Sequence, residues 1–411
     1  MMTGYSLLLF QPIKASSEGS RFIEDITDIA EDWRRSIRMQ GGYWMGSFEY
    51  IDKPQLCEEF FRTYLGYEIR EYVGGLQTWE GMIAEMVYDP IIDENGFASV
   101  QVNLIGYVHT LQWRYCTVSG TADYANLYIE SIIDTDAEFL QKGRIDSNLT
   151  EVQFSRKINQ RVWDEINQIT DMGDTDGNPW RFYVGNDRKA NYHKIDVDPI
   201  YYIKSGIKRR RSLTDMENSI VGQYEGGEGK MHDLMPVDNQ ESIVKYGRRE
   251  GDLFVSNVDI GPATQMQHLQ LSEYAWPWAR VENLEEAIVY GNINDIVPIN
   301  PYLVVPAIVR DINYPTKGQE HGSWLKDLRD FFIEEVEVSQ DGLALRSGET
   351  TLESLIPRDA LDKKGNRRQR MVQKMRKYQG GVPSKSGTGG WSDPSQMAAW
   401  YQAHKERKLN K

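Results

Sequence analysis

Apolar and polar residues alternate between Ala98 and Val108, and this pattern constrains the fold more than any other feature of the sequence. Polar residues such as Gln101 and Asn103 separate the apolar members of the series. Those apolar members are Ala98, Val100, Val102, Leu104 and Val108. Because successive side chains of a strand point to opposite faces, the alternation predicts a half-buried β-strand.

The residues before this segment predict further strands. These cover residues 5–10, 43–50, 67–73 and 76–88. Gly74-Gly75 lies between the last two, and such a glycine pair is typical of a tight hairpin. Residues 28–39 fit either a helix or a strand, and the strand would form a hairpin at Gly41-Gly42.

One helix is predicted among these strands, over the segment from Pro54 to Leu65. Asp52 is placed to cap its start, and Gly66 is placed to end it. Leu56, Phe60 and Tyr64 recur along one face, so Cys57 beside them is expected to be a small core residue. Several strands with one helix predict a first β-barrel or sandwich domain over residues 1–117.

The rest of the chain predicts three further parts. Residues 118–198 predict an α+β domain, and residues 199–357 predict a second β-barrel domain with a helical insertion near Pro262 to Tyr274. Residues 358–411, rich in Lys, Arg, Gly and Ser, predict a basic C-terminal extension. The expected fold class is therefore α+β and β-rich. Helices are expected at 123–133 and 154–169, and strands at 181–184, 191–195, 303–312 and 331–338.

Charge is distributed unevenly along the chain. The net charge is −14, from 47 basic and 61 acidic residues. Residues 358–411 hold 14 basic and four acidic residues, so the other 357 residues carry −24. A body this acidic is expected to repel nucleic acid, because phosphate groups are also negative.

Neither a membrane span nor a disulfide framework is expected. No apolar run reaches the roughly 18 residues that a spanning helix needs, and the segment from Met1 to Phe10 lacks the features of a signal peptide. Cys57 and Cys116 are the only cysteines. Synthesis in a reducing cytoplasm is therefore expected.

No catalytic signature stands out. The sequence has no Walker loop, no HExxH motif and no GxSxG elbow. The loop from Asp171 to Pro179 is acidic like a calcium loop, but Gly177 comes too early and the terminal glutamate is missing, so a turn is preferred. Among 61 acidic residues, pairs such as Glu334-Glu335 occur by chance. No catalytic residue, cofactor or metal ligand is predicted.

Two groups of basic residues are candidate protein-interface sites. The first lies inside the acidic body, where it is either a surface turn between strands or a contact with an acidic neighbour. It comprises Lys208, Arg209, Arg210 and Arg211. The second lies in the C-terminal extension and comprises Lys363, Lys364, Arg367, Arg368, Arg370, Lys374, Arg376 and Lys377.

Several short patterns resemble the hub proteins of phage tails. The first is Gly41-Gly42-Tyr43-Trp44 with Ser47-Phe48, followed by the helix from Pro54 and by Trp79-Glu80-Gly81 at the head of a strand. The other patterns are Ser131-Ile-Ile, Gln141-Lys-Gly-Arg-Ile and Ala275-Trp-Pro. Together they cover residues 25 to 280, and the basic extension is not part of the resemblance.

The resemblance implies a non-enzymatic virion protein of a tail tip or baseplate. Such a hub has two tail-tube-like barrel domains per chain, and three chains form a homotrimeric ring around the DNA channel. The implied partners are the tail tube protein, the distal tail protein, the central spike or tip protein and the tape measure protein. DNA would meet the ring only in passage, and no membrane integration is implied.

Three other functions remain open from the sequence alone. A distal tail adaptor would form a ring of six. A tail-associated cell-wall hydrolase would hold two buried acids in a cleft. A carbohydrate-binding module for host attachment would display an exposed aromatic platform.

Overall fold

The structure is a computed structural model that describes most of the first 347 residues. The described residues are 4–11, 21–91, 96–118, 123–152, 160–174, 178–196, 198–204, 207–211, 213, 216–226, 230–256, 260–276, 279–281, 283–313, 329–340 and 342–347. The chain divides into two compact units, Met1–Ala360 and Leu361–Lys411. All described residues belong to the first unit, so the predicted basic extension lies outside them.

Seven strands of the first 105 residues form one continuous antiparallel sheet. They are β1 (Tyr5–Phe10), β2 (Phe22–Asp25), β3 (Ala30–Arg38), β4 (Gly41–Asp52), β5 (Glu68–Val73), β6 (Leu76–Asp89) and β7 (Ala98–Ile105). Their order across the sheet is β3-β4-β7-β6-β5-β1-β2. The segment 28–39 thus contains a strand and not a helix, and β3 pairs with β4 as the first arm of a hairpin.

The alternating segment forms β7, as predicted, but the strand ends at Ile105. Val100, Val102 and Leu104 are buried, while Gln101 and Asn103 are exposed. Gly106 then starts the 3₁₀ helix η1 (Tyr107–Gln112). A Cβ at Gly106 would lie 1.7 Å from the carbonyl oxygen of Tyr43. Only glycine fits at this close approach, and Val108 lies in η1, after the end of the strand.

The predicted helix is confirmed as α1 (Pro54–Thr63), with a different cap. Lys53, not Asp52, occupies the N-cap position, and no side chain caps the helix. The Asp52 carboxylate instead accepts a hydrogen bond from the Lys53 amide at 2.7 Å. Cys57 and Phe60 are buried, and Phe60 stacks on Tyr50 with 4.1 Å between ring centroids. Cys57 is therefore a core residue, as expected.

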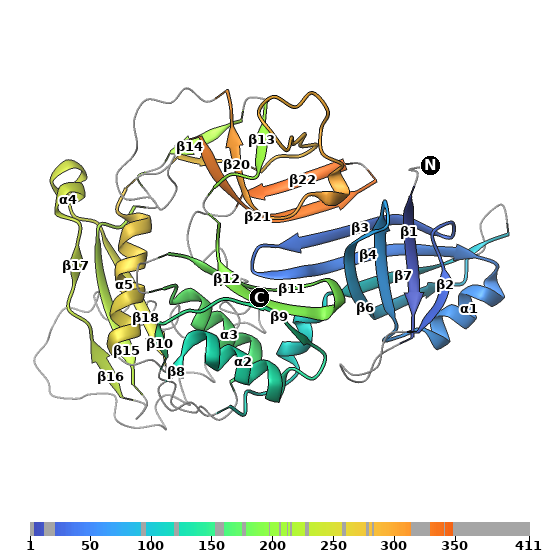
Figure 1. Ribbon diagram of the computed structural model, residues 1–411, viewed down its shortest axis with the longest axis horizontal. Helices are drawn as coiled ribbons and strands as arrows, with labels where there is room; N and C mark the ends of the chain where they lie inside the picture. Colours follow the sequence, from blue (N-terminus) through green and yellow to red (C-terminus); the bar gives the residue numbers. More distant parts are fainter. Residues whose placement is uncertain are drawn as a thin grey trace, which may run out of the picture. The chain divides into compact units, whose positions relative to one another are not determined.

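The segment after η1 combines helices and strands. Its elements are β8 (Asp123–Tyr124), α2 (Ala125–Asp136), β9 (Gln141–Ile145), β10 (Glu151–Val152), α3 (Val162–Asp171), β11 (Trp180–Gly185), the 3₁₀ turn η2 (Asn186–Arg188) and β12 (Lys189–Lys194). β11 and β12 form an antiparallel hairpin, and β9 runs parallel to β12. Figure 1 shows α2 and α3 beside these strands. The predicted α+β character is confirmed.

The described residues after 200 contribute the remaining elements. The strands are β13 (Tyr201–Ile203), β14 (Arg209–Arg211), β15 (Ser219–Glu225), β16 (Met231–Asp233), β17 (Val237–Asp238), β18 (Glu250–Ser256), β19 (Ala279–Val281), β20 (Ile308–Asp311), β21 (Asp330–Ser339) and β22 (Gly342–Ser347). The helices are α4 (Gln240–Tyr246), α5 (Ile260–Tyr274) and η3 (Pro301–Leu303). α5 is the helical insertion that was predicted near residues 262–274.

One 14-stranded sheet connects all three predicted domains. β21 pairs antiparallel with β3, and β11 pairs parallel with β4 through Gly41 and Gly42. The main path runs openly from β13 to β2, and no closed barrel is found among the described strands. The fold is thus α+β and β-rich, as predicted, but the barrels are not found. The domain boundaries stay predictions.

Two large apolar clusters stabilise the first unit. One lies under the N-terminal sheet and also contains residues from β13, β20, β21 and β22. The other surrounds α2 and α3 and includes Trp44, Trp163 and Phe182. Since both clusters combine residues far apart in the sequence, the sheet and its additions are held as one body by apolar burial.

Candidate functional site: a buried carboxylate cluster and an acidic sheet face

Three glutamates of the β5–β6 hairpin are fully buried. Glu68, Glu71 and Glu80 each have 0% of their surface exposed. Residues of one parity share a face of a strand, and Arg70 lies opposite Glu80 in the register. Glu68, Arg70 and Glu80 therefore meet on one face of the hairpin. Glu71 has the other parity and points to the opposite face.

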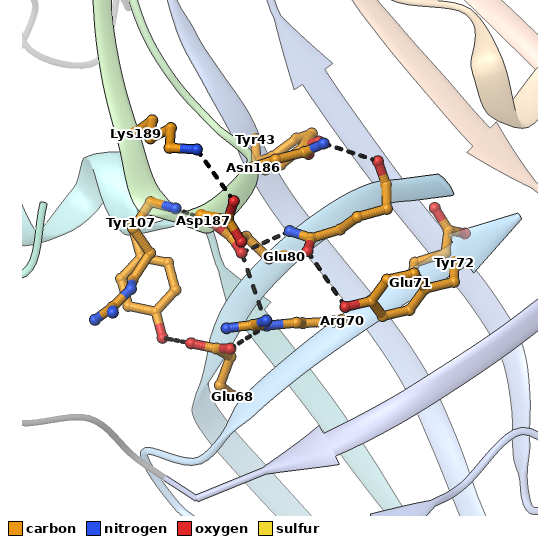
Figure 2. Close-up of polar contacts among 12 residues, drawn as sticks. Tyr43, Glu68, Arg70, Glu71, Tyr72, Glu80, Tyr107, Asn186, Asp187 and Lys189 are labelled. Atoms are coloured by element: carbon orange, nitrogen blue, oxygen red, sulfur yellow. Dashed lines mark hydrogen bonds and ion pairs between the residues drawn. The ribbon is translucent and has the colours of Figure 1, made fainter. Parts of the chain in front are cut away.

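Figure 2 shows how the first face is held together. Arg70 forms an ion pair with Glu68, and its Nε lies 3.9 Å from Oε2 of Glu80. The Tyr107 hydroxyl, from η1, donates a hydrogen bond to Glu68. Glu80 accepts hydrogen bonds from the Gln77 amide side chain at 2.6 Å and from the backbone N–H of Arg188.

Burial, and after it the negative charge of Glu68, raise the pKa of the Glu80 carboxyl to about 7. The hydrogen bond from the Arg188 backbone and the charge of Arg70 act in the opposite direction. Desolvation is the largest cause because a buried carboxylate loses the water that stabilises its charge. Glu80 therefore exchanges a proton near neutral pH.

Glu71 holds a second cluster on the opposite face. Its carboxylate lies 2.5 Å from Nε of Arg35 and accepts hydrogen bonds from the Trp33 indole at 2.5 Å and the Thr78 hydroxyl at 2.6 Å. Arg35 also donates to the carbonyl oxygen of Tyr302 at 2.5 Å. This cluster ties β3, β5 and β6 to the 3₁₀ helix η3, which is more than 200 residues away in the sequence.

Two buried acids, one with a raised pKa, would also suit a hydrolase. Here the carboxylates of Glu68 and Glu80 have no exposed surface, and both accept hydrogen bonds or ion pairs from the protein. A substrate would have to displace these partners to reach either acid. The geometry thus fits a structural clamp with one exchangeable proton.

The acidic loop around Asp174, considered as a calcium site from the sequence, makes hydrogen bonds within the protein itself. The carboxylate of Asp174, in the acidic loop, accepts hydrogen bonds from the Asn178 backbone at 2.8 Å and the Trp180 indole at 3.2 Å. Its pKa is lowered: burial opposes this, but the hydrogen bonds from Asn178 and Trp180 outweigh it. These contacts fit a turn. Within the described ranges, no three His, Cys, Asp or Glu side chains are grouped to hold a metal ion.

The exposed face of the sheet carries two rows of side chains, polar except for Val87, that cross β3, β4, β7 and β6. One row comprises Glu31, Glu49, Gln101 and Val87. The other comprises Arg34, Ser47, Asn103 and Glu85. Three carboxylates and one guanidinium give this face a charge of about −2 at neutral pH.

Of the first predicted basic group, the structure describes the side chains of Lys208 and Arg209 only. Lys208 is exposed. Arg209 is turned inward, where Nη2 lies 3.5 Å from the Asp311 carboxylate and donates to the carbonyl of Arg329 at 3.3 Å. Arg210 and Arg211 belong to β14, which pairs with β19, and their side chains lie outside the described residues. The predicted interface role of this group stays a prediction.

The second predicted group lies wholly outside the described residues. It comprises Lys363, Lys364, Arg367, Arg368, Arg370, Lys374, Arg376 and Lys377. Its role also stays a prediction.

Sequence reasoning missed the buried carboxylates. Glu80 lies inside the run from Thr78 to Ile83, in which every residue is buried. A glutamate in the middle of such an apolar strand signals a buried ion pair, because an isolated charge there is too costly. The charged partner is Arg70 on the neighbouring strand, and the backbone N–H of Arg188, more than 100 residues away, carries no signal of its own.

Within the described residues, no helix is long and apolar enough to cross a membrane. No protein-family model matches the sequence, and no curated protein matches it.

Solved tail proteins are similar to the chain in three dimensions. The tail protein from Neisseria meningitidis MC58 matches at a TM-score of 0.51 and 12% identity, over 86% of this chain and 100% of the other. A prophage tail protein from Listeria monocytogenes EGD-e matches at 0.49 and 14%, over 85% and 97%. A 43 kDa tail protein of a Shewanella oneidensis prophage matches at 0.49 and 11%, over 85% and 98%.

The match to the Neisseria protein spans that protein completely, although few residues are identical. A common fold at such low identity shows shared architecture and does not by itself show a shared activity. The chain has the fold of a tail protein, and the predicted resemblance is confirmed at that level.

Proposed function

We propose that the chain is a structural protein of a phage tail tip or baseplate. In this proposal it forms a hub ring that joins the tail tube to the central spike and surrounds the DNA channel. The observation that carries the proposal is the fold shared with the Neisseria tail protein over the whole length of that protein. The protein acts through its surfaces and does not catalyse a reaction.

The exposed sheet face supports a channel role. Its two polar rows contain Glu31, Glu49 and Glu85, with Arg34 as their only basic member. Affinity for DNA comes mainly from basic side chains that neutralise phosphates. A wall with more acidic than basic groups therefore lets DNA pass without holding it. We place this face toward the channel.

The proposed partners follow from the position of a hub. The chain contacts other copies of itself, in a homotrimer, and contacts the tail tube protein, the distal tail protein, the spike or tip protein and the tape measure protein. Ring contacts of this kind use matched surfaces that repeat around an axis. The proposed location is the virion tail, after synthesis in the host cytoplasm.

The native mass of the purified full chain tests the ring. One chain has a mass of 47.5 kDa, so light scattering should find a species of about 142 kDa for three copies. A species of six copies supports the distal adaptor instead. A monomer at every concentration, with and without the tail tube protein, contradicts the hub.

A cell-wall hydrolase is the second candidate, because Glu68 and Glu80 are two neighbouring buried acids. Release of soluble fragments from purified cell walls distinguishes the two. The hub proposal expects no release above a buffer control. Release that disappears in both Glu68→Gln and Glu80→Gln, with folding intact, supports the hydrolase.

A further inference from the structure

The tip of the β11–β12 hairpin differs in its chemistry from the hairpin that carries it. The arms are anchored by apolar side chains, and Phe182, Val184, Ala190 and Tyr192 are almost completely buried. The tip, Asn186-Asp187-Arg188-Lys189, has no apolar residue. Since apolar burial supplies most of the free energy that resists local opening, the tip is held much more weakly than the arms.

Hydrogen bonds and one cation–π contact hold the tip to the sheet, and in the latter the Arg188 guanidinium lies 5.6 Å from the centroid of the Tyr107 ring. The Tyr43 hydroxyl donates to the Asn186 side chain, which in turn donates to the carbonyl of Gln77 at 3.2 Å. The Arg188 backbone N–H donates to Glu80. These contacts reach β4 and β6, so the tip bridges the hairpin and the N-terminal sheet, as Figure 2 shows.

Two features of the tip oppose this closed position. Asp187 and Arg188 both have left-handed backbones, with φ of 57° and 58°, and neither is glycine. Such a conformation is unfavourable for a residue with a Cβ atom, because the Cβ comes too close to the following carbonyl oxygen. The Arg188 side chain is 3% exposed, and its Nε and Nη1 have no hydrogen-bond partner among the described residues. In the closed tip, the backbone is thus strained at Asp187 and Arg188, and two buried nitrogen atoms of Arg188 lack hydrogen-bond acceptors.

We propose that the tip, Asn186 to Lys189, is a latch that opens locally over the buried carboxylates of Glu68 and Glu80 while the arms of the hairpin stay folded. Closing places the Arg188 backbone N–H on Glu80 and covers this carboxyl. Opening releases the strain at Asp187 and Arg188 and exposes an acidic pocket on the sheet. This local opening and closing of the tip does not depend on the proposed hub function.

The proton on Glu80 sets the balance between the two states. In the closed tip, burial and then the charge of Glu68 hold the pKa of Glu80 near 7. An opened tip returns water to the carboxyl, and its pKa falls toward the ordinary value of about 4.3. The closed state therefore binds the proton more tightly, so opening becomes easier as the pH rises from about 4 to about 7.

The titratable groups that face Glu80 come from four neighbouring elements, β4, β5, η1 and η2. They are Glu68 and Arg70 on β5, Tyr43 on β4, Tyr107 on η1 and Arg188 on η2. Burial raises the pKa of both tyrosines far above neutral, so they stay uncharged in this range. The arginines stay charged. Glu68 is the other carboxylate beside Glu80, so a separate Glu68 variant is needed to distinguish its effect from that of Glu80.

Amide hydrogen exchange of the full chain at pH 5, 6, 7 and 8, corrected for intrinsic exchange rates, tests the latch. We expect the protection of the Arg188 amide to fall about tenfold per pH unit between pH 5 and 7 and then to level off. Protection at Phe182 and Tyr192, in the arms, should not change. Equal protection at Arg188 and Phe182 at every pH would overturn the latch.

Three variants identify the titrating group. Glu80→Gln should flatten the pH profile of the Arg188 amide, and Glu68→Gln should shift its plateau to lower pH. Glu85→Gln, on the exposed face of the same strand, should leave the profile unchanged. A slope that persists in a folded Glu80→Gln protein contradicts the role of this carboxyl.

A fourth variant tests the latch without relying on titration. Asp187→Gly relieves a left-handed conformation in the closed state, so it should raise the protection of the Arg188 amide several-fold. The same variant should leave Phe182 and Tyr192 unchanged. A fall in Arg188 protection would contradict the strained closed state and would do so even if Glu80→Gln failed to fold.

Discussion

Arg35 of β3 and Glu71 of β5 form an ion pair with 2.5 Å between Nε and Oε2, and neither side chain has any exposed surface. The two strands are not neighbours in the sheet. The pair is thus made through the interior of the fold, and Arg35 extends it to the carbonyl of Tyr302. It connects the N-terminal sheet to a segment near the end of the described chain.

Removing one partner of this pair should destabilise the protein strongly. Glu71→Gln leaves the Arg35 charge buried without its counter-ion, which costs about 3–5 kcal/mol. Urea denaturation followed by tryptophan fluorescence measures the loss. The matched control is Arg62→Ala, which removes the exposed pair with Glu58 and should cost less than about 0.5 kcal/mol. Equal effects of the two variants would contradict the burial of the pair.

His109 should make the protein less stable in acid. Burial, with a smaller contribution from the nearby charge of Arg38, lowers the pKa of its imidazole to about 4. The unfolded chain has a pKa of about 6.5. A depressed pKa contributes stability that is present above pH 6.5 and is lost as the pH falls toward 4.

Denaturation at pH 7, 6, 5 and 4.5 measures this loss, which should reach on the order of 1–3 kcal/mol. His109→Asn keeps a hydrogen-bond donor for the carbonyl of Trp44 and cannot titrate, so its stability should depend less on pH in this range. His232, which is exposed, serves as the control in His232→Asn. An unchanged pH dependence in His109→Asn would show that other groups cause it.

Gly106 should not tolerate alanine. The new Cβ would lie 1.7 Å from the carbonyl oxygen of Tyr43, so β4 and η1 would have to move apart. We expect a loss of at least about 3 kcal/mol or failure to fold. Gly261→Ala is the control, because its Cβ would meet nothing within 4 Å and it lies in α5. That variant should be neutral or stabilising by up to about 1 kcal/mol in thermal unfolding.

The sequence predicted local structure well where one face of an element is buried. The alternation at Val100, Val102 and Leu104 specified β7, and the spacing around Phe60 specified α1. Neither pattern contains information about pairing between distant segments. The pairing of β21 with β3 joins residues about 300 positions apart, and for this reason two separate barrels were expected where one open sheet is found.

The candidate site was predicted less well than the fold. Glu68 and Glu71 look like ordinary surface acids in a chain with 61 acidic residues, and only Glu80, inside an apolar run, carries a signal. Their burial depends on Arg35, Arg70 and the backbone of Arg188, which reach them from other elements. Charged clusters of this kind are visible only after the chain has folded, because sequence spacing does not encode the contacts that neutralise them.

Glu49 should be a residue at which stability and function conflict. It lies directly opposite Glu31 across β3 and β4, and like charges in this position repel each other. Glu49→Lys replaces the repulsion with attraction, so thermal unfolding should show a gain of about 0.2–1 kcal/mol.

If the sheet face lines a DNA channel, the same change adds a phosphate contact where the native protein has none. Fluorescence anisotropy with labelled duplex DNA should then detect binding by the triple variant Glu31→Lys, Glu49→Lys, Glu85→Lys, and this binding should weaken steeply as salt increases. The wild-type chain and the triple Gln variant are the controls, and neither should bind through this face. Because the body outside the basic extension carries −24, a wild-type chain that binds DNA as tightly as the Lys variant would show that the face does not determine DNA contact.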